Sequence, residues 1–197
     1  MPVLVFATNN KYKLKEARSI LPLSIELKSL ADIGCTDELP ETGSTLEANS
    51  LQKARYVYEK FGLPCFSDDT GLEVDALSGA PGVYSARYAG PNATSAQNLS
   101  RLLREMTDVY DRKAKFRTVI SLLGVGDLEI FSGAVDGTLL DSPRGDDGFG
   151  YDPVFVPEGY RLTFSEMAPH IKNSLSHRGI ALRLMTDWLQ NRMKSGF

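Results

Sequence analysis

The chain has 197 residues, of which 42% are hydrophobic and 24% charged, and its formal net charge is -3 with a pI of about 5.5. This size and composition are typical of one compact globular domain, which we expect to span residues 1–197. The acidic balance argues against a surface that coats nucleic acid, because such a surface needs an excess of Lys and Arg.

The cysteines and the apolar runs predict the compartment. Cys35 and Cys65 belong to no CxxC or Cys/His cluster, so we expect free thiols in a reducing environment. No stretch approaches the roughly 18 apolar residues of a membrane helix, and the apolar run over residues 3–7 is too short for a signal peptide. Together these features predict a cytoplasmic protein that does not bind membranes.

The first part of the chain alternates between strand and helix patterns. A continuous apolar run is typical of a buried strand, whereas apolar residues three or four apart mark one face of a helix. These patterns predict a strand over residues 3–7, a helix over 11–21 that Pro22 ends, a weaker strand over 25–30 and a polar loop over 31–43.

The next helix has an explicit start in the sequence. Ser44 followed three positions later by Glu47 is the pattern of a capping box, so we expect a helix to begin there and to end at Gly62. Two short strands are expected after it, namely residues 64–69, which finish in the pair Asp68-Asp69, and residues 72–77.

The second half of the chain predicts another capped helix and a pair of strands. Thr94 and Gln97 form a second capping-box pattern, which opens a helix that runs to about Met106. The other expected elements are a loop over 78–92, antiparallel strands over 115–123 and 128–135, a loop over 141–153, a strand over 154–156 and a final helix containing residues 181–189. The whole pattern predicts an α/β fold with a central mixed sheet flanked by helices.

The first candidate site is the junction between the first strand and the first helix, residues 8–13. Backbone N–H groups at a helix N-terminus, and the positive end of the helix dipole, favour an anion such as a phosphate. Thr8 and Asn10 could donate hydrogen bonds from their side chains, and Lys13 could place its ammonium on a phosphate. The alternative is that Thr8, Asn9 or Asn10 only caps the helix and that the lysines lie on a solvated face.

The second candidate is the acidic pair Asp68-Asp69 at the end of a predicted strand. Open α/β folds place their sites at such strand ends, and short carboxylates are ligands that suit Mg²⁺. One of the two could also orient or deprotonate a water, and Glu41 could supply a further carboxylate near the metal. The alternative is a polar turn, for which Asp-Asp-Thr-Gly is favourable chemistry.

The third candidate lies on the second helix, where Asn49 and Lys53 are four positions apart. Residues at this spacing share one face of a helix, and this face lies outside the apolar stripe. The pair could therefore belong to a site, or it could lie on an ordinary solvated face.

The fourth candidate is the glycine-rich segment of residues 145–153. Glycines let the backbone approach a ligand closely, and the ring of Phe149 or Tyr151 can stack on a base. Asp152 can accept a hydrogen bond from a ring N–H. A structured turn is the alternative.

The fifth candidate comprises Lys172, His177 and Arg178, which precede or open the last predicted helix. The guanidinium of Arg178 could donate two parallel hydrogen bonds, and its neighbour His177 could stack or donate. Ordinary surface at a helix N-terminus is the alternative.

Taken in chain order, six motifs resemble the inosine triphosphate pyrophosphatase family, the pyrophosphatases of non-canonical purine NTPs. The motifs are TNNxxK from Thr8, ETGxTxExNxxxKA from Glu41, SDDTGLEVDAL from Ser67, GAPGVYSARYAG from Gly79, GFGYDPVF from Gly148 and SHRG from Ser176. They extend to Gly179 and so cover nearly the whole chain. The chain has Asn9 where many members carry Gly, and Thr70 where many carry Ser, which keeps the hydroxyl.

The resemblance implies an elongated, two-lobed single α/β domain with an active-site cleft between the lobes, and a homodimer. It implies Mg²⁺-dependent hydrolysis of ITP, dITP or XTP to the nucleoside monophosphate and pyrophosphate. Asp69 and Lys13 would be catalytic, and Asp69, Asp68 and Glu41 would bind Mg²⁺. The substrate would contact Thr8, Asn9, Asn10, Lys11, Tyr12, Lys13, Lys53 and Thr70, and its base would contact Phe149, Gly150, Tyr151, Asp152, Lys172, His177 and Arg178.

Hydrogen-bond chemistry supplies a reason for this choice of base. Hypoxanthine and xanthine present an O6 acceptor and an N1–H donor, whereas adenine presents the reverse pattern. A site with a donor such as Arg178 or a backbone N–H, and an acceptor such as Asp152, would therefore reject ATP. GTP shares both groups with ITP and has to be excluded at its 2-amino group.

Other functions stay open on the sequence. The same reaction could act on pyrimidine or modified-pyrimidine triphosphates, or the chain could be a nucleotide-binding regulator without turnover. The paired carboxylates argue against a regulator, because a triphosphate binder gains from acidic residues only where they hold a metal. RNA binding is disfavoured by the acidic pI and by the lack of a basic, aromatic surface.

Overall fold

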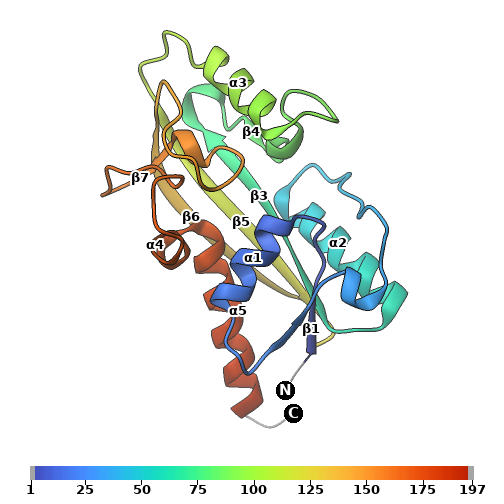
Figure 1. Ribbon diagram of the computed structural model, residues 1–197. Coiled ribbons are helices and arrows are strands. Elements are labelled where there is room, and N and C mark those ends of the chain that lie inside the picture. Colours follow the sequence, from blue (N-terminus) through green and yellow to red (C-terminus); the bar gives the residue numbers. More distant parts are fainter. Residues whose placement is uncertain (1–2, 195–197) are drawn as a thin grey trace. The chain divides into compact units, whose positions relative to one another are not determined.

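The computed structural model describes residues 3–194 of the chain, within which it has five α-helices and a seven-stranded sheet (Figure 1). The helices are α1 (Lys11–Ile20), α2 (Leu46–Phe61), α3 (Ser95–Glu105), α4 (Pro169–Leu175) and α5 (His177–Lys194). The strands are β1 (Val3–Phe6), β2 (Glu26–Lys28), β3 (Cys65–Val74), β4 (Pro81–Gly82), β5 (Lys113–Leu123), β6 (Glu129–Leu139) and β7 (Phe155–Pro157).

The sheet is mixed, as the sequence predicted. Its strand order is β2-β1-β3-β5-β6-β7, and β4 pairs with β3 outside this path. Strand β1 runs parallel to both β2 and β3, whereas the pairs β3–β4 and β6–β7 are antiparallel. The predicted α/β class with a central mixed sheet is therefore confirmed.

The chain divides into two compact units. Unit 1 comprises residues 1–69, 118–133 and 178–197, and unit 2 comprises residues 70–117 and 134–177. Strands β3, β5 and β6 each contribute residues to both units.

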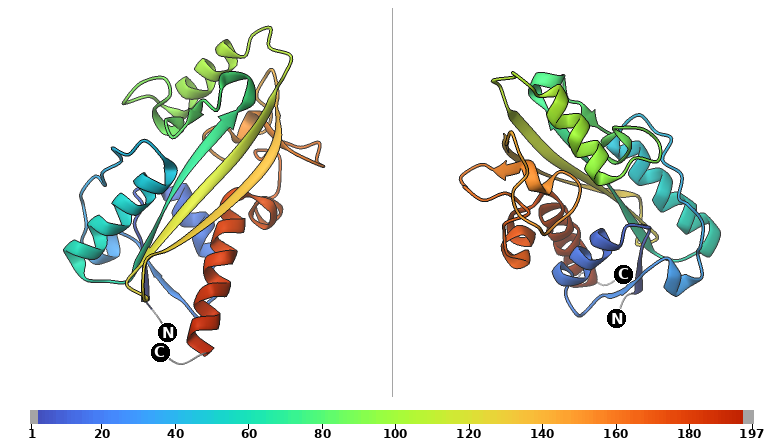
Figure 2. Two further views of the ribbon diagram at one scale, coloured as in Figure 1. Left: turned by 180° about the vertical axis from the view of Figure 1, so that it is seen from behind. Right: turned by 45° about the horizontal axis from the view of Figure 1, so that its top comes forward.

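Unit 1 packs helices on both faces of its part of the sheet (Figure 2). Successive side chains of a strand point to opposite faces, so Leu4 and Phe6 of β1 pack with α1 and α5, whereas Val5 and Ala7 pack with α2. This alternation explains why residues 3–7 read as one continuous apolar run. Any polar residue in the neighbouring part of β3 must likewise face either α1 and α5 or α2.

Unit 2 has a core of its own. Helix α3 contributes Leu99 and Leu102, its C-cap residue Met106 lies beside them, and the segment between β6 and α4 contributes large aromatic residues. Among these, Phe155 and Phe164 lie with ring centroids 5.1 Å apart. The core holds this segment, which carries the fourth candidate site, against the strands of the unit.

Most predicted helix ends are confirmed, with one correction. Thr94 and Gln97 form the capping box of α3, and Gly62 ends α2 in the left-handed conformation with φ 66°. The N-cap of α2 is Thr45, which accepts from the backbone N–H of Ala48, so the start predicted at Ser44 is wrong by one residue. Ser44 and Thr45 are both residues that favour the N-cap position, so the sequence alone does not distinguish between them.

The second correction concerns the acidic pair. Residues 64–69 and 72–77 were expected as two strands, but β3 runs without a break from Cys65 to Val74. The alternative of a polar turn at Asp-Asp-Thr-Gly is therefore wrong. Gly71 fits here because a Cβ at this position would lie 2.6 Å from the carbonyl oxygen of Gly82 in β4. Strand β4 lies within residues 78–92, which were expected as a loop, and the short helix α4 was not predicted either. The other strands lie within a few residues of their predicted bounds.

Candidate active site

Asp68 and Asp69 lie side by side in β3 and point to opposite faces of the sheet. Phe66, two residues before Asp68, packs with α1 and α5, whereas Cys65 packs with α2. The two-residue period of a strand therefore directs Asp68 towards α1 and α5 and Asp69 towards α2. Both carboxylates are buried, with exposures of 1% and 7%.

The carboxylate of Asp68 is held by two cations from two helices. Lys13 of α1 donates to its Oδ1 at 2.9 Å, and the Nε of Arg178 at the start of α5 donates to its Oδ2 at 2.9 Å. Arg178 also donates to Glu16 of α1 through another guanidinium nitrogen. These residues, Glu16, Lys13, Asp68 and Arg178, form what we call the α1–α5 cluster.

Electrostatics keep the α1–α5 cluster charged. Burial alone would raise the pKa of Asp68, but Lys13 and Arg178 outweigh it and hold that pKa well below its usual range. Burial would also lower the pKa of Arg178, yet Asp68 and Glu16 raise it above its ordinary value. Burial lowers the pKa of Lys13, and Asp68 offsets this only in part.

The carboxylate of Asp69 has different partners, all on the side of α2. Its Oδ2 accepts from the side-chain amide of Asn49 at 3.1 Å, and its Oδ1 lies 3.7 Å from the ammonium of Lys53. Lys53 also donates to the backbone carbonyl of Asp68 at 2.7 Å and to the carboxylate of Glu41. We call Glu41, Asn49, Lys53 and Asp69 the α2 cluster.

The pKa of Asp69 moves in the direction opposite to that of Asp68. Burial raises the pKa of Asp69 above its ordinary value of 3.8, Lys53 and Lys13 offset this only in part, and the nearby Glu41 adds to it. Burial would lower the pKa of Lys53, but Asp69 and Glu41 outweigh it and raise that pKa. A carboxylate with a raised pKa beside a fixed ammonium is suited to accept a proton.

The junction before α1 is held by hydrogen bonds of its own side chains. Asn10 caps the helix, since its side chain accepts from the backbone N–H groups of Tyr12 and Lys13 at 2.9 and 3.2 Å. Thr8 in turn accepts from the backbone N–H of Asn10 at 3.2 Å, and Asn9 donates to the carbonyl of Asp37. The capping alternative is thus confirmed for Asn10.

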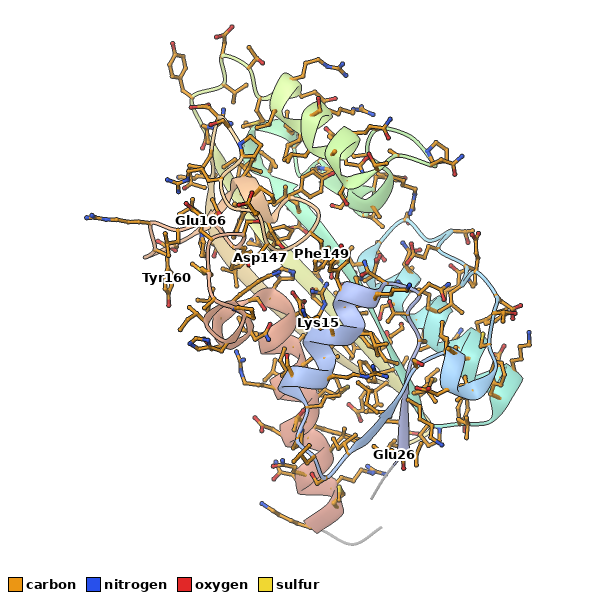
Figure 3. All side chains as sticks on the ribbon, in the orientation of Figure 1. Lys15, Glu26, Asp147, Phe149, Tyr160 and Glu166 are labelled. Carbon is orange, nitrogen blue, oxygen red and sulfur yellow. The ribbon has the colours of Figure 1, made fainter. Side chains whose placement is uncertain are left out.

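Only one of the lysines near this junction turns inward. Lys11 and Lys15 are exposed, as Lys15 shows on α1 in Figure 3, and Tyr12 is 58% exposed. The Lys13 side chain is 13% exposed and contacts Asp68. The solvated-face alternative therefore holds for Lys11 and Lys15 and is wrong for Lys13.

The solvated-face alternative is also wrong for the pair on α2. Asn49 has no exposed surface and Lys53 has 4%. Their spacing of four residues places both on the side of α2 that faces β3 and residues 37–43. The spacing in the sequence predicted that Asn49 and Lys53 share one face of the helix, but not that this face is buried.

Unit 2 gathers several of the residues predicted to contact a base. The Oδ2 of Asp152 accepts from the ammonium of Lys172 at 2.7 Å and from the backbone N–H of Phe149 at 2.8 Å. The ammonium of Lys172 also lies 5.0 Å from the centre of the Phe149 ring. Figure 3 shows Phe149 with Asp147 in the loop between β6 and β7. Gly148 adopts φ +87° close to Asp152, where a Cβ would meet the carboxylate at 2.5 Å.

The other predicted base residues are built into packed surroundings. Tyr151 is 4% exposed within the core of unit 2, and its hydroxyl donates to the carbonyl of Ser85 at 2.9 Å. His177 is buried with its ring stacked on Phe116 at 4.6 Å. Gly150 has φ +64°, a conformation that favours glycine. Phe149 is only partly buried and is thus more exposed than Tyr151.

Arg178 belongs to the α1–α5 cluster of unit 1. Its guanidinium is 1% exposed and pairs with Asp68 and Glu16. Glu16 was not predicted as part of any site. Its spacing of three residues from Lys13 on a helix places both on one face, but this spacing is too common to single out Glu16.

The carboxylates of the α2 cluster fit Mg²⁺ if substrate phosphates supply the other ligands. Within residues 3–194, no three His, Cys, Asp or Glu side chains are grouped so that they could hold a metal ion. Mg²⁺ is commonly bound through one or two carboxylates together with substrate phosphates. Glu41 and Asp69, both beside Lys53, supply that kind of donor set, whereas both oxygens of Asp68 already accept from cations.

Comparison with known proteins decides the family. The model of the Ham1 family matches residues 4–188 of the chain. The chain belongs to the Ham1 family. The dITP/XTP pyrophosphatase of Porphyromonas gingivalis (strain ATCC BAA-308 / W83) is 50% identical over 190 residues, which cover 96% of this chain and 98% of that protein.

Solved structures of the Ham1 family agree with this fold. A HAM1 protein from Coxiella burnetii has a TM-score of 0.88 and 38% identity, and covers 97% of this chain and 100% of its own. The Staphylococcus aureus Ham1 protein has a TM-score of 0.86 and 35% identity, with coverages of 96% and 98%. The resemblance drawn from the six motifs is confirmed, and so, at the level of the family, is the prediction of a pyrophosphatase.

None of the helices within residues 3–194 is both long and apolar enough to cross a membrane.

Proposed function

We propose that the chain hydrolyses dITP, ITP and XTP to the nucleoside monophosphate and pyrophosphate. The observation that carries the proposal is the buried pair Asp68-Asp69. Cations of two helices bind the carboxylate of Asp68, whereas a neutral amide binds that of Asp69 and the ammonium of Lys53 lies 3.7 Å away from it. The names of the Ham1-family relatives support the choice of substrates, since the curated relative from Porphyromonas gingivalis is called a dITP/XTP pyrophosphatase.

In the proposed reaction, a water attacks the α-phosphorus and the bond to the β-phosphate oxygen breaks. Asp69 orients the water and accepts its proton. Pyrophosphate leaves with the electron pair of the broken bond. Lys13 and Lys53 neutralise the charge that develops on the phosphate oxygens.

The junction before α1 would take part of the triphosphate. The positive end of a helix dipole favours an anion, and Asn10, which accepts from the N–H groups of Tyr12 and Lys13, fixes the first turn of α1. We assign this role to the substrate-binding stretch Thr8, Asn9, Asn10, Lys11, Tyr12 and Lys13, with Thr70 next to Asp69 in β3.

The charge balance supports a need for Mg²⁺. Lys13, Lys53 and Arg178 already face four carboxylates, those of Glu16, Glu41, Asp68 and Asp69. An anionic triphosphate therefore meets a region without excess positive charge. Bound Mg²⁺ would supply that charge to the phosphate oxygens, and Glu41 and Asp69 are the residues that we propose to hold it.

For the base, we propose Phe149 as the stacking ring and the Asp152–Lys172 pair as the polar contacts. Asp152 can accept from N1–H of hypoxanthine or xanthine, and Lys172 can donate to O6, whereas ATP would leave both groups mismatched. Arg178, whose guanidinium pairs with Asp68 and Glu16, would act on the phosphate side rather than on the base.

Steady-state kinetics test the function directly. We expect kcat/KM for dITP, ITP and XTP to exceed that for GTP, ATP and dTTP by at least about 100-fold, with pyrophosphate and not orthophosphate as the product. EDTA should abolish turnover, and added Mg²⁺ should restore it. Preference for dTTP or UTP would support the pyrimidine enzyme instead, and tight ITP binding without pyrophosphate release would support a regulator.

A further inference from the structure

Asn49 has a fully buried side-chain amide whose oxygen and nitrogen both form hydrogen bonds. It lies in α2, four residues after the N-cap Thr45, and has no exposed surface. Its Oδ1 accepts from the backbone N–H of Gly43 at 2.7 Å, and its Nδ2 donates to Oδ2 of Asp69 at 3.1 Å. Burial of a carboxamide is unfavourable unless both ends are bonded, which is the case here.

The chemistry of the two partners fixes the orientation of the amide. The backbone N–H of Gly43 can only donate, so it must face the oxygen of Asn49 and not the nitrogen. The NH₂ group then has to face Asp69, which accepts. No other arrangement of this amide satisfies both contacts, and so one oxygen of Asp69 is held in one direction.

The contact with Gly43 depends on very close packing. A Cβ at position 43 would lie 2.6 Å from the Cβ of Ala48 and 2.9 Å from the Oδ1 of Asn49. Only glycine leaves room for the backbone to approach Asn49 in this way. Asn49 thereby joins Asp69 to the chain segment that carries Glu41, two residues before Gly43.

The segment of residues 37–43 runs along α2 in the opposite direction to the helix. Its polar contacts step up the helix at successive turns: Gly43 with Asn49, Thr42 with Gln52, Glu41 with Lys53, and Asp37 with Tyr56 and Lys60. All of these contacts fasten the segment to α2. Among them, Asn49 and Lys53 are also in contact with Asp69.

We propose that Asn49 is a positioning residue, which holds the carboxylate of Asp69 in its productive orientation and in register with the segment that carries Glu41. The proposal rests on the proposed hydrolysis, in which Asp69 acts on the attacking water. With Oδ2 held by Asn49, Oδ1 is the oxygen directed to the side of Lys53. Loss of such a partner typically lowers activity by about 10- to 100-fold without removing a reacting group.

The test compares Asn49→Ala with Gln52→Ala. Gln52 also fastens the segment to α2, through the backbone N–H and hydroxyl of Thr42, but its bonds are to Thr42 and not to Asp69. We expect Asn49→Ala to lower kcat for ITP by about 10- to 100-fold with KM changed less than about 3-fold. Gln52→Ala should keep kcat near that of the wild type. Equal losses in both variants would overturn the proposal, because fastening of the segment would then explain them.

A double-mutant cycle separates positioning from general damage to the fold. If Asn49 acts through Asp69, then Asn49→Ala should cost nothing further in kcat once Asp69→Asn is present. An additive loss would overturn the proposal. Asn49→Asp, which keeps the shape but replaces the donor by a carboxylate, should lose at least as much kcat as Asn49→Ala, and a fully active Asn49→Asp would also contradict it.

Two controls keep the outcome interpretable. Thermal unfolding and the binding of an ITP analogue with a methylene group between the α- and β-phosphates show whether each variant is folded and takes substrate. Failure of the proposed function would appear in the wild type, as absent turnover. Failure of the positioning proposal would appear as an active wild type and an Asn49→Ala variant with unchanged kcat.

Discussion

The two faces of β3 carry neighbouring aspartates that differ in almost every physical respect. On the face towards α1 and α5, Asp68 accepts from Lys13 and Arg178, and its pKa lies well below the usual range. On the face towards α2, Asp69 accepts from a neutral amide, and its pKa is raised. Adjacent positions in the sequence thus carry one carboxylate whose pKa is lowered and one whose pKa is raised.

The difference follows from the number of cations that reach each carboxylate. Two helices deliver cations to within hydrogen-bond distance of Asp68, whereas the ammonium of Lys53 remains 3.7 Å from Asp69. In buried surroundings a charged carboxylate needs such partners, and where they are too few its pKa rises. We therefore expect Asp68 to contribute mainly to stability and Asp69 mainly to catalysis, and the following predictions test this difference.

The largest effect should come from Asp69→Asn. Loss of the carboxylate that we propose as the proton acceptor should lower kcat for ITP by about 100- to 10,000-fold. The melting temperature should be at least that of the wild type, because a buried carboxylate with a raised pKa is replaced by a neutral isostere. Steady-state kinetics and calorimetry measure the two properties. A variant that kept near-wild-type turnover would remove Asp69 from the reaction.

Asp68→Asn should affect stability instead. The substitution leaves Lys13 and the fully buried Arg178 facing a neutral amide. Breaking a buried ion pair by removal of one partner typically costs about 3–5 kcal/mol of unfolding free energy. Urea denaturation measures this loss, with Asp69→Asn as the matched neighbour. If both variants lost the same amount, the two faces of β3 would not differ as we describe.

Acidification should change the stabilising contributions of Asp68 and Asp69 in opposite directions. The folded-state pKa of Asp68 is depressed, so its stabilising contribution is present above its unfolded value of 3.8 and is lost as the pH falls below that value. Asp69 has a raised folded-state pKa, so its protonation below that pKa stabilises the folded state. We expect the difference in unfolding free energy between the wild type and Asp68→Asn to shrink as the pH falls from about 5 towards 2. A difference that did not change with pH would contradict the assignment of Asp68.

Local patterns in the sequence were sufficient for most of the fold. Periodicity and caps act within a few residues, and so α1, α3 and the end of α2 lie where they were predicted. The acidic stretch of β3 could not be predicted as a strand, because Asp and Gly disfavour strands and favour turns. The cations that compensate Asp68 come from residues 55 and 110 positions away, which no local pattern can reveal.

The grouping of the candidate site residues was predicted, but their arrangement around β3 was not. The residue types named at β3, at the junction before α1 and on α2 do come together within unit 1. Their division between two faces of one strand was not predicted, because it depends on β3 being continuous through the pair. Arg178 was expected at the base, but its pairing with Glu16 and Asp68 depends on the packing of α1 and α5.

The smallest effect that still tests the comparison should come from Glu16→Gln. Glu16 is 15% exposed and pairs with the buried Arg178, so its loss removes a charge-assisted hydrogen bond of the α1–α5 cluster. We expect a loss of about 1.5–3 kcal/mol in unfolding free energy, with kcat changed less than about 3-fold. Glu26→Gln is the matched control, because Glu26 pairs with Lys28 at 3.7 Å on the surface, where such pairs contribute about 0–1 kcal/mol. If Glu16→Gln lost no more stability than Glu26→Gln, or if it lowered kcat as much as Asn49→Ala, Glu16 would not be a structural partner of Arg178.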